Sequence, residues 1–343
     1  MIRKVLVRWE TLLVVAIFGV GVWSATLSPF FLHRANLLDL VTPYIFIGLM
    51  AFGLTFVVVA GEIDISVASV LAASVVCFAQ VFAAGANVWV AALVGLVVAT
   101  VLGLANGALV GLLNLPSLAI TLGTMAAYSG LAFVVLSGEG VAEFPSGYSE
   151  IGGGYIRNEL PVALLVFLGA AVVLGVLLHA TRFGRYLFAI GSNKEAARLS
   201  GIPVTRVRVT VFALSGFMAG IAGVVYVGYF GSARADAAQG SLLDVVTAVV
   251  LGGVDIFGGA GSILGVFLAV VLVAEVRNGM QLANLSGDTQ NIVIGALLLA
   301  AIVIGNLIRS AESGGLRRRL TPRRRREVTS GQSQATVVVD PKS

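Results

Sequence analysis

The chain has 343 residues, of which 58% are hydrophobic and only 11% are charged. A water-soluble domain carries about 25% charged residues, so this composition excludes a soluble cytosolic enzyme or nucleic-acid-binding domain and leaves a polytopic membrane protein. The net charge of +5 comes from the end of the chain, because nine basic residues and only three acidic ones lie within 309–343.

Ten apolar runs are long enough, or nearly long enough, to cross a membrane, which takes about 20 helical residues. They predict an all-α fold, a polytopic transmembrane helical bundle of about ten spans. The short eighth run and the polar break between the second and third runs indicate chain that stops or turns within the membrane. The runs are 11–28, 39–59, 67–85, 88–112, 117–137, 161–180, 209–231, 242–253, 261–277 and 290–308.

Charge asymmetry predicts the orientation, since cytoplasmic segments are rich in Lys and Arg. The N-terminus and residues 181–208 are basic, whereas 138–160 is acidic. We therefore expect a cytoplasmic N-terminus at 1–10 and a transmembrane domain at 11–308 with a cytoplasmic loop at 181–208. We expect 309–343 to be an Arg-rich, disordered cytoplasmic tail that contacts membrane lipids rather than nucleic acid.

The polar turn 61–66, Gly-Glu-Ile-Asp-Ile-Ser, separates the second and third runs. Carboxylates at membrane depth are costly and usually face a cavity or a partner, and Glu62 and Asp64 share one face of an extended segment. The turn is therefore either a pore-lining or gating element or a short loop with Asp64 or Ser66 as the N-cap of the next helix. The residues alone favour neither interpretation.

Other polar residues are scattered through the apolar runs. Such side chains either suit the path of a hydroxylated solute or form hydrogen bonds between helices. Glu275 and Arg277 lie near the end of a run, so we expect both to reach the membrane interface. The scattered residues are Asn106, Thr121, Thr124, Asp244, Thr247, Glu275, Asn278 and Gln290.

A short helix is predicted at Lys194–Leu199, within the cytoplasmic loop. Asn193 or Ser192 is a suitable N-cap, Gly201 a suitable residue after the helix, and Pro203 a stop signal. Such a helix either docks into a cytoplasmic partner or is an ordinary capped loop helix.

Residues 251–262 contain five glycines around Asp255 and, by the count of spans, face the cytoplasm. Glycines permit tight turns and close backbone contacts. The segment is a second gating or docking loop, or a turn between two helices.

Catalytic motifs are missing. The sequence contains no GxxxxGK[ST], HExxH or GxSxG pattern, and its two histidines lie far apart. It therefore predicts no catalytic residue, no metal site, no cofactor and no ATPase activity of its own.

With these motifs the chain resembles the membrane-spanning permease of bacterial ABC sugar importers of the ribose, autoinducer-2 and rhamnose type. The resemblance covers residues 37–308 and rests on five motifs in the family's order and spacing. These are GEIDIS with the following Val67-Ala-Ser69, Asn106–Val110, Leu115–Thr124, Gly184–Ile202 and Leu251–Gly259.

The resemblance implies a multi-pass permease in the bacterial cytoplasmic (inner) membrane that moves a monosaccharide: a pentose, a deoxyhexose such as rhamnose, or an autoinducer-2-like compound. The implied partners are a second, identical or homologous permease subunit, a cytoplasmic P-loop ATPase and an extracytoplasmic sugar-binding protein. Ala60 and Asp255 depart from the family's usual residues, which leaves the gate and the substrate open.

The resemblance also implies two sets of functional residues. The ATPase-coupling loop would consist of Asn193, Lys194, Glu195, Ala196, Ala197, Arg198, Leu199 and Gly201. The translocation path or gate would include Glu62, Asp64, Ser66, Asn106, Thr121, Thr124 and Asp255.

The main alternative is a proton- or ion-coupled secondary transporter, a class with buried titratable groups and inverted repeats. Asp244, Asp255 and Glu275 are candidate groups, but the sequence shows no convincing internal repeat. A channel or membrane scaffold is a third possibility, which solute leak through the chain alone would support.

Overall fold

The computed structural model describes residues 9–136, 140–157 and 159–312. The chain divides into two units, Met1–Ile302 and Val303–Ser343, and every residue of the site described below lies in the first. The predictions for the N-terminus at 1–10 and the Arg-rich tail at 309–343 fall largely outside the described residues.

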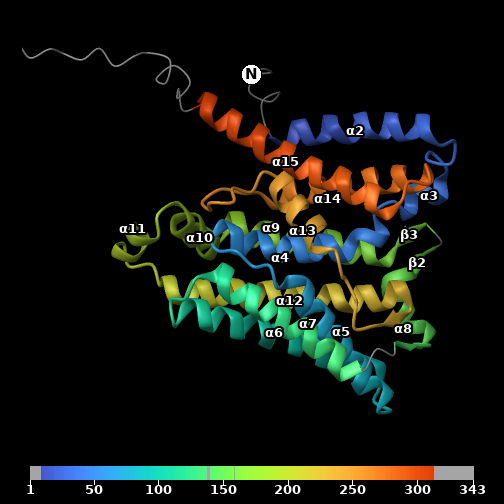
Figure 1. The fold of residues 1–343 in the computed structure, drawn as a ribbon, viewed down its shortest axis with the longest axis horizontal. Helices are drawn as coiled ribbons and strands as arrows, with labels where there is room; N and C mark the ends of the chain where they lie inside the picture. Colours follow the sequence, from blue (N-terminus) through green and yellow to red (C-terminus); the bar gives the residue numbers. More distant parts are fainter. Residues whose placement is uncertain (1–8, 137–139, 158, 313–343) are drawn as a thin grey trace, which may run out of the picture. The chain divides into compact units, whose positions relative to one another are not determined.

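The described chain is almost entirely helical, with two small two-stranded ladders in which β1 pairs with β4 and β2 with β3, both antiparallel (Figure 1). In chain order the elements are α2 (Trp9–Leu27), α3 (Arg34–Asp39), the 3-10 turn η1 (Thr42–Tyr44), α4 (Ile45–Val59), α5 (Val67–Ala83), α6 (Val88–Gly111), α7 (Ser117–Leu136), β1 (Val141–Ala142), α8 (Ser146–Gly153), β2 (Tyr155–Ile156), β3 (Leu160–Pro161), α9 (Val162–Ala180), α10 (Arg182–Ser192), α11 (Lys194–Leu199), α12 (Val204–Phe230), β4 (Ser232–Ala233), α13 (Leu242–Leu251), α14 (Ile263–Leu282) and α15 (Gly287–Glu312).

Within the described residues, eight helical segments are long and apolar enough to cross a membrane, and α5 and α13 are shorter apolar helices. Together they correspond one to one with the ten apolar runs, which confirms the predicted polytopic helical bundle. Several observed bounds differ from the predicted ones; for example, α12 begins at Val204, directly after Pro203, and α14 continues to Leu282. Glu275 and Arg277, the charged residues near the predicted end of this span, are buried inside the helix bundle.

Two of the crossings are interrupted. After α4 the chain turns at Gly61, whose φ of +77° favours glycine, and runs without regular structure to Ser66 before α5 begins. The chain after α12 likewise has irregular structure before α13, whose ten residues are about 15 Å long at 1.5 Å per residue. Helix α13 therefore covers about half of a 30 Å hydrocarbon core, and the irregular chain before it completes that crossing. Residues 62–66 likewise extend the crossing that contains α5.

The two ends of the first unit differ in charge. Segments α10 and α11 lie at one end, at the left of Figure 1, and carry several Lys and Arg residues. The elements α8, β2 and β3 lie at the opposite end, where Glu159 pairs with Arg34 at 3.1 Å. The positive-inside rule therefore predicts that the α10–α11 end is cytoplasmic and the α8 end extracytoplasmic.

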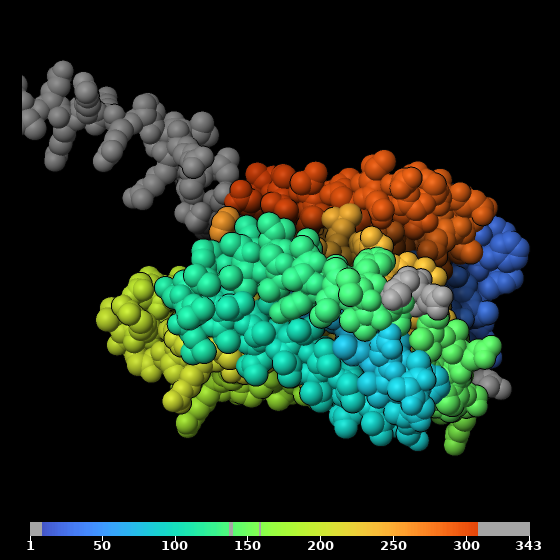
Figure 2. All heavy atoms as spheres, turned by 60° about the horizontal axis from the view of Figure 1, so that its bottom comes forward, coloured from blue at the N-terminus to red at the C-terminus, as the bar shows by residue number. Residues whose placement is uncertain are grey.

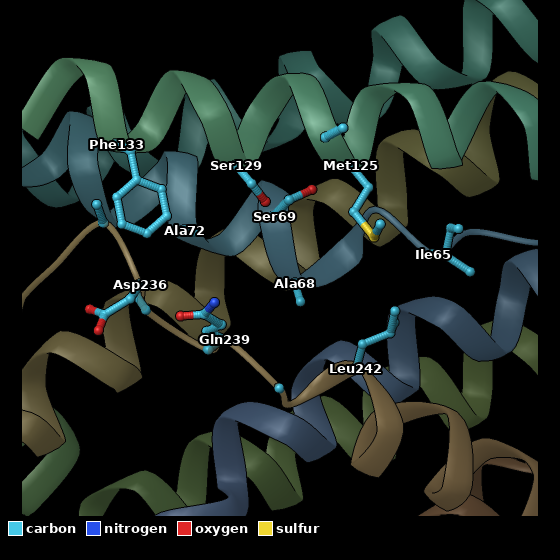
Figure 3. Close-up of a pocket in the computed structure, with 15 residues that line it drawn as sticks. Ile65, Ala68, Ser69, Ala72, Met125, Ser129, Phe133, Asp236, Gln239 and Leu242 are labelled. Carbon is cyan, nitrogen blue, oxygen red and sulfur yellow. The ribbon is translucent and has the colours of Figure 1, made fainter.

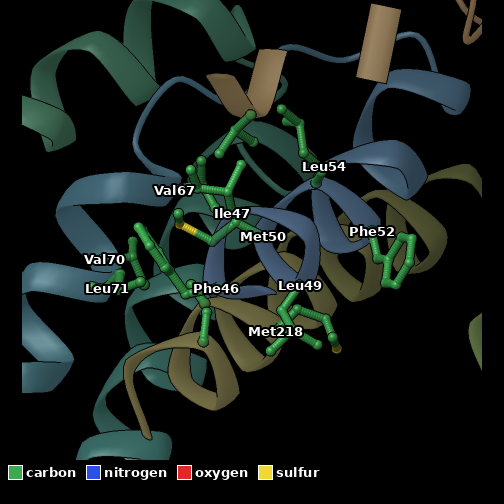
Figure 4. Close-up of a cluster of buried hydrophobic side chains, with 14 of the residues drawn as sticks. Phe46, Ile47, Leu49, Met50, Phe52, Leu54, Val67, Val70, Leu71 and Met218 are labelled. Atoms are coloured by element: carbon green, nitrogen blue, oxygen red, sulfur yellow. The ribbon is translucent and has the colours of Figure 1, made fainter. Parts of the chain in front are cut away.

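Helix α4 forms the centre of the core. Nearly all of its side chains are buried, and it packs against α12, α13, α14 and α9. Figure 4 shows Phe46, Leu49 and Met50 of α4 in one cluster with Leu71 of α5 and Met218 of α12. A helix that is apolar on all sides is expected at such a central position.

Helices α6 and α7 form one outer face of the first unit, which lies toward the viewer in Figure 2. Only 11% of the apolar window of α7 is buried, although the helix is strongly hydrophobic. Its apolar outer side therefore suits lipid or another transmembrane protein rather than water.

Candidate functional site

The polar turn 61–66 has no regular secondary structure, and the burial of its side chains alternates. Glu62, Asp64 and Ser66 are buried, while Ile63 between the first two is exposed. Because side chains alternate along an extended chain, the polar residues all point into the helix bundle, as their spacing predicts.

Asp64 is held by hydroxyl and backbone donors. Its Oδ1 accepts hydrogen bonds from the backbone N and the hydroxyl of Ser66, at 2.9 and 2.6 Å, and its Oδ2 accepts one from the Ser215 hydroxyl of α12 at 3.0 Å. Ser66 precedes α5 but makes no side-chain capping bond to it. Ser66 thus occupies the predicted N-cap position, but its hydroxyl donates to Asp64 and offsets part of the cost of burying the carboxylate.

Helices α6 and α7 also bind the polar turn. Asn106 donates to the Ser66 hydroxyl at 2.8 Å and accepts a bond from Tyr128 at 3.1 Å. The hydroxyl of Ser117 accepts from the backbone N of Ile63, and Thr121 contacts the Ile63 carbonyl oxygen. The predicted residues Asn106 and Thr121 thus hold helices to the turn.

A buried ion pair links the turn to the start of α12. Arg208 Nε lies 2.5 Å from Glu62 Oε1, and the two side chains are 5% and 9% exposed. Arg208 also donates to Asn114 Oδ1 at 3.0 Å, and Lys194, the first residue of α11, donates to the same oxygen at 3.4 Å. Partial burial lowers the pKa of Lys194, and the positive charge of Arg208 acts in the same direction.

Helix α11 has the predicted bounds and caps. The side chain of Asn193 accepts from the backbone N of Ala196 at 3.0 Å, and Gly201 follows the helix with a φ of +79°. Among the predicted coupling residues, Ala197 is buried, whereas Glu195, Ala196, Arg198 and Leu199 are exposed, with Arg198 and Glu195 paired at 3.0 Å. Figure 2 shows this region at one end of the molecule, in yellow-green.

Three glycines bring separate motifs into backbone contact. A Cβ on Gly258 would lie 2.7 Å from the Cα of Gly61 and 3.0 Å from the Cα of Gly191, and Gly259 N donates to the Val59 carbonyl oxygen at 2.9 Å. We call Gly61, Gly191 and Gly258 the glycine junction. It places the polar turn, the end of α10 and the glycine-rich loop after α13 side by side at the predicted cytoplasmic end.

Asp255 shapes this glycine-rich loop. Its carboxylate accepts from the backbone N of Phe257 at 3.0 Å, and its own N donates to the Ala260 carbonyl oxygen. The side chain of Phe257 is 86% exposed. The structure thus places Asp255 in a tight turn beside α10, at the end where α11 lies.

A cavity of about 380 Å³ lies between α5, α7 and the loop before α13 (Figure 3). The polar turn, through Ile65, and the irregular loop before α13 both contribute to its lining. The polar residues on its wall are Ser69, Ser129, Gln239 and Asp236, whose carboxylate pairs with Arg234 at 2.8 Å, and the rest is apolar. Its lining consists of Ile65, Ala68, Ser69, Ala72, Met125, Ala126, Ser129, Phe133, Ala235, Asp236, Ala237, Ala238, Gln239, Gly240 and Leu242.

The predicted path residues do not line this cavity. Glu62, Asp64, Ser66, Asn106 and Thr121 form bonds inside the bundle. Thr124 donates to the Thr121 carbonyl oxygen at 3.4 Å, and Asp255 lies in the glycine-rich loop. Most of the predicted path residues are therefore held inside the bundle and do not face the cavity. Ile65 is the one residue of the polar turn that lines the cavity.

Sequence reasoning missed a second buried ion pair. Arg277 donates to both carboxylate oxygens of Asp244, at 2.7 to 2.9 Å, and also to Gln290 and Asn291. The expectation that Arg277 reaches the interface is wrong, because pairing with Asp244 compensates the guanidinium within the bundle. Glu275 is buried as well, against the α2 residue Gly21, so it does not reach the interface either. Opposite charges in neighbouring apolar runs were the available signal for the pair.

The Asp244–Arg277 pair adjoins another cavity, of about 360 Å³, near the start of α4 and the end of α14. Tyr44, whose hydroxyl accepts from Gln281 at 3.0 Å, and Gln239 also line it. Since Gln239 and Gly240 border both cavities, the loop before α13 separates them. Among the described residues, no group of three or more His, Cys, Asp or Glu side chains is arranged to hold a metal ion.

Comparison with known proteins adds two findings. Residues 36–302 match the family described as the permease component of the branched-chain amino acid transport system. The autoinducer 2 import system permease protein LsrD of Yersinia enterocolitica serotype O:8 is 37% identical over 286 residues, which cover 80% of this chain and 86% of the relative. Proteins of the same description in Escherichia coli O9:H4 and Shigella flexneri are 36% identical over 306 residues, covering 86% of this chain and 91% of each relative.

Proposed function

The chain belongs to the family of permease components of branched-chain amino acid transport systems, and from this membership and the site geometry we propose that it carries autoinducer-2 or a related sugar through the inner membrane as part of an ABC importer. It is a multi-pass protein of the sugar-importer permeases, which are transporter subunits and not enzymes themselves. ATP hydrolysis comes from a separate cytoplasmic ATPase, since the sequence has no P-loop.

The cavity at α5 and α7 is the part of the solute path that this subunit contributes. The relatives are described as autoinducer 2 import permeases, and hydroxyl and amide groups such as those of Ser129 and Gln239 suit an uncharged, hydroxylated solute. The wall has few polar groups, so binding is weak and the solute can leave. High affinity resides in an extracytoplasmic sugar-binding protein, and a second permease subunit completes the path.

The observation that carries the proposal is the meeting of three motifs at the cytoplasmic end. Through the glycine junction and Asn114, the exposed helix α11 contacts the polar turn that leads directly into α5 and the cavity. A movement imposed on α11 by an ATPase would reach the cavity through rigid elements. Residues Asn193–Leu199 and Gly201 are the proposed coupling loop, and Glu62, Asp64 and Ser66 support the proposed gate.

The variant Ala196→Glu is expected to abolish binding of the ATPase without unfolding the permease. Ala196 is exposed in the first turn of α11, where Glu is well tolerated and can form a capping box, but its charge and bulk would occupy the docking surface. The measurement is co-purification of the ATPase with the permease. Ala84→Glu is the control, because Ala84 is exposed at the end of α5 remote from α11.

Equal ATPase recovery with Ala196→Glu and the wild type would contradict the assignment of α11 as the docking helix. Uptake of autoinducer-2 by the purified permease alone, driven by a proton gradient, would instead favour the secondary-transporter alternative.

The variant Ala68→Phe is expected to block uptake while leaving ATPase binding intact. Ala68 projects into the cavity (Figure 3), and a phenyl ring there would remove on the order of 100 Å³ from a space of ordinary small-ligand size. Uptake of labelled autoinducer-2 into proteoliposomes that contain all subunits measures the effect. Ala296→Phe, on an exposed face of α15, should transport normally, and normal uptake by Ala68→Phe would show that the solute passes elsewhere.

A further inference from the structure

Asn114 occupies an unusual position in the turn between α6 and α7. Its φ is +52°, in the left-handed region that Asn tolerates better than other residues with a side chain. Its single side-chain oxygen accepts bonds from two cations on different elements, Lys194 of α11 and Arg208 of α12. The amide therefore connects three segments that are far apart in the sequence.

The connection continues into the bundle. Arg208 is 4% exposed and pairs with Glu62, the first carboxylate of the polar turn. Asp64, two residues after Glu62, binds Ser66 and Ser215. Ile65, which lies between Asp64 and Ser66 in the sequence, lines the cavity. Polar contacts thus link the surface helix α11 to Glu62 through Asn114 and Arg208, and the backbone of the polar turn continues from Glu62 to Ile65 at the cavity wall.

Asn114 is suited to control this connection because it orients Arg208. Arg208 Nη1 donates a hydrogen bond to Asn114, while Nε lies beside the Glu62 carboxylate in an ion pair that includes no hydrogen bond. A planar guanidinium group is effective only when its orientation is fixed. A shift of α11 that moves Lys194 would alter the contacts of the Asn114 oxygen and, through this oxygen, the position of Arg208. The buried Glu62 must then follow Arg208, because an unpaired buried carboxylate is costly.

We propose that Asn114 is a positioning residue for transport, which couples movement of α11 to the polar turn through Arg208 and Glu62. This proposal rests on the proposed function, in which an ATPase moves α11. In this proposal Asn114 contacts neither the solute nor the ATPase. It determines how much of the movement of α11 in each ATPase cycle is transmitted to the cavity.

The variant Asn114→Gly separates this role from backbone effects, since Gly adopts the same φ without strain and only the amide is lost. The matched control is Asn284→Gly, because Asn284 also has a left-handed φ, +56°, but lies in the turn between α14 and α15. Asn114→Asp is the rescue variant, because its carboxylate can accept from both cations.

The experiment uses proteoliposomes with the complete importer and measures both ATP hydrolysis and uptake of autoinducer-2. We expect Asn114→Gly to retain assembly and hydrolysis while uptake per ATP falls at least about fivefold, the lower end of ordinary coupling between sites. Asn114→Asp should recover most of the ratio, and Asn284→Gly should match the wild type.

An unchanged ratio in Asn114→Gly would overturn the inference, and so would a loss of assembly and hydrolysis that Asn114→Asp fails to restore. Both results are judged against a wild-type importer that transports. A wild-type complex with no ATP-dependent uptake would instead refute the proposed function, so the two failures are distinguishable.

Discussion

Replacing Arg277 by Met is expected to destabilise the folded permease by about 3–5 kcal/mol, the usual cost of removing one partner from a buried ion pair. The guanidinium binds both oxygens of Asp244 in a part of the bundle where the two side chains are 11% and 7% exposed. Without it the carboxylate would be left among apolar helices with little compensation, and Gln290 and Asn291 would each lose a donor.

Thermal unfolding of the purified permease in detergent measures this loss. Arg34→Met is the matched control, because its ion pair with Glu159 is 70% exposed on both sides, and pairs of that kind contribute about 0–1 kcal/mol. The double variant Arg277→Met with Asp244→Leu should recover much of the stability, since replacing both charges removes the uncompensated one. Equal losses of stability from Arg277→Met and Arg34→Met would show that the buried pair stabilises the fold no more than the exposed pair does.

The variant Gly191→Ala is expected to separate the segments of the glycine junction and to abolish coupled transport. Its Cβ would overlap with the Val59 carbonyl oxygen and with the backbone N of Gly259. These are backbone atoms, which cannot rotate away, so the polar turn or the glycine-rich loop must shift. Overpacking of this kind costs about 1–3 kcal/mol, and here the strain falls on the hydrogen bond between Gly259 and Val59.

The control is Gly169→Ala in α9, where a Cβ meets no atom within 4 Å and a helix is stabilised by roughly 0.5–1 kcal/mol when Ala replaces Gly. Thermal stability and ATP-dependent uptake would be compared for the two variants. Wild-type uptake by Gly191→Ala would mean that close contact at the junction is dispensable for transport.

The sequence was informative where structure depends on local signals. The ten apolar runs predicted the helices because burial in lipid requires long apolar stretches. The bounds of α11 were predictable because Asn193 and Gly201 are capping residues that act within one turn of the helix.

The partners of the buried charges were not predictable from the sequence. Glu62 could have paired with any cation near the cytoplasmic end, and only the packing of α12 against α4 and α6 brings Arg208 to it. The cavity could not be predicted from the sequence either, because alanines such as Ala68 and Ala72 carry no functional group that marks a binding site. Their importance comes from the space that they leave between helices.

The alternation within the polar turn restricts how this segment can evolve. Inserting or deleting a single residue between Gly61 and Ser66 would exchange the two sides of the extended chain, so that isoleucines would replace the carboxylates beside Arg208 and Ser215. Substitutions that keep the spacing would disturb one contact at a time. The number of residues in this stretch is thus under stronger constraint than the identity of its outward-facing ones.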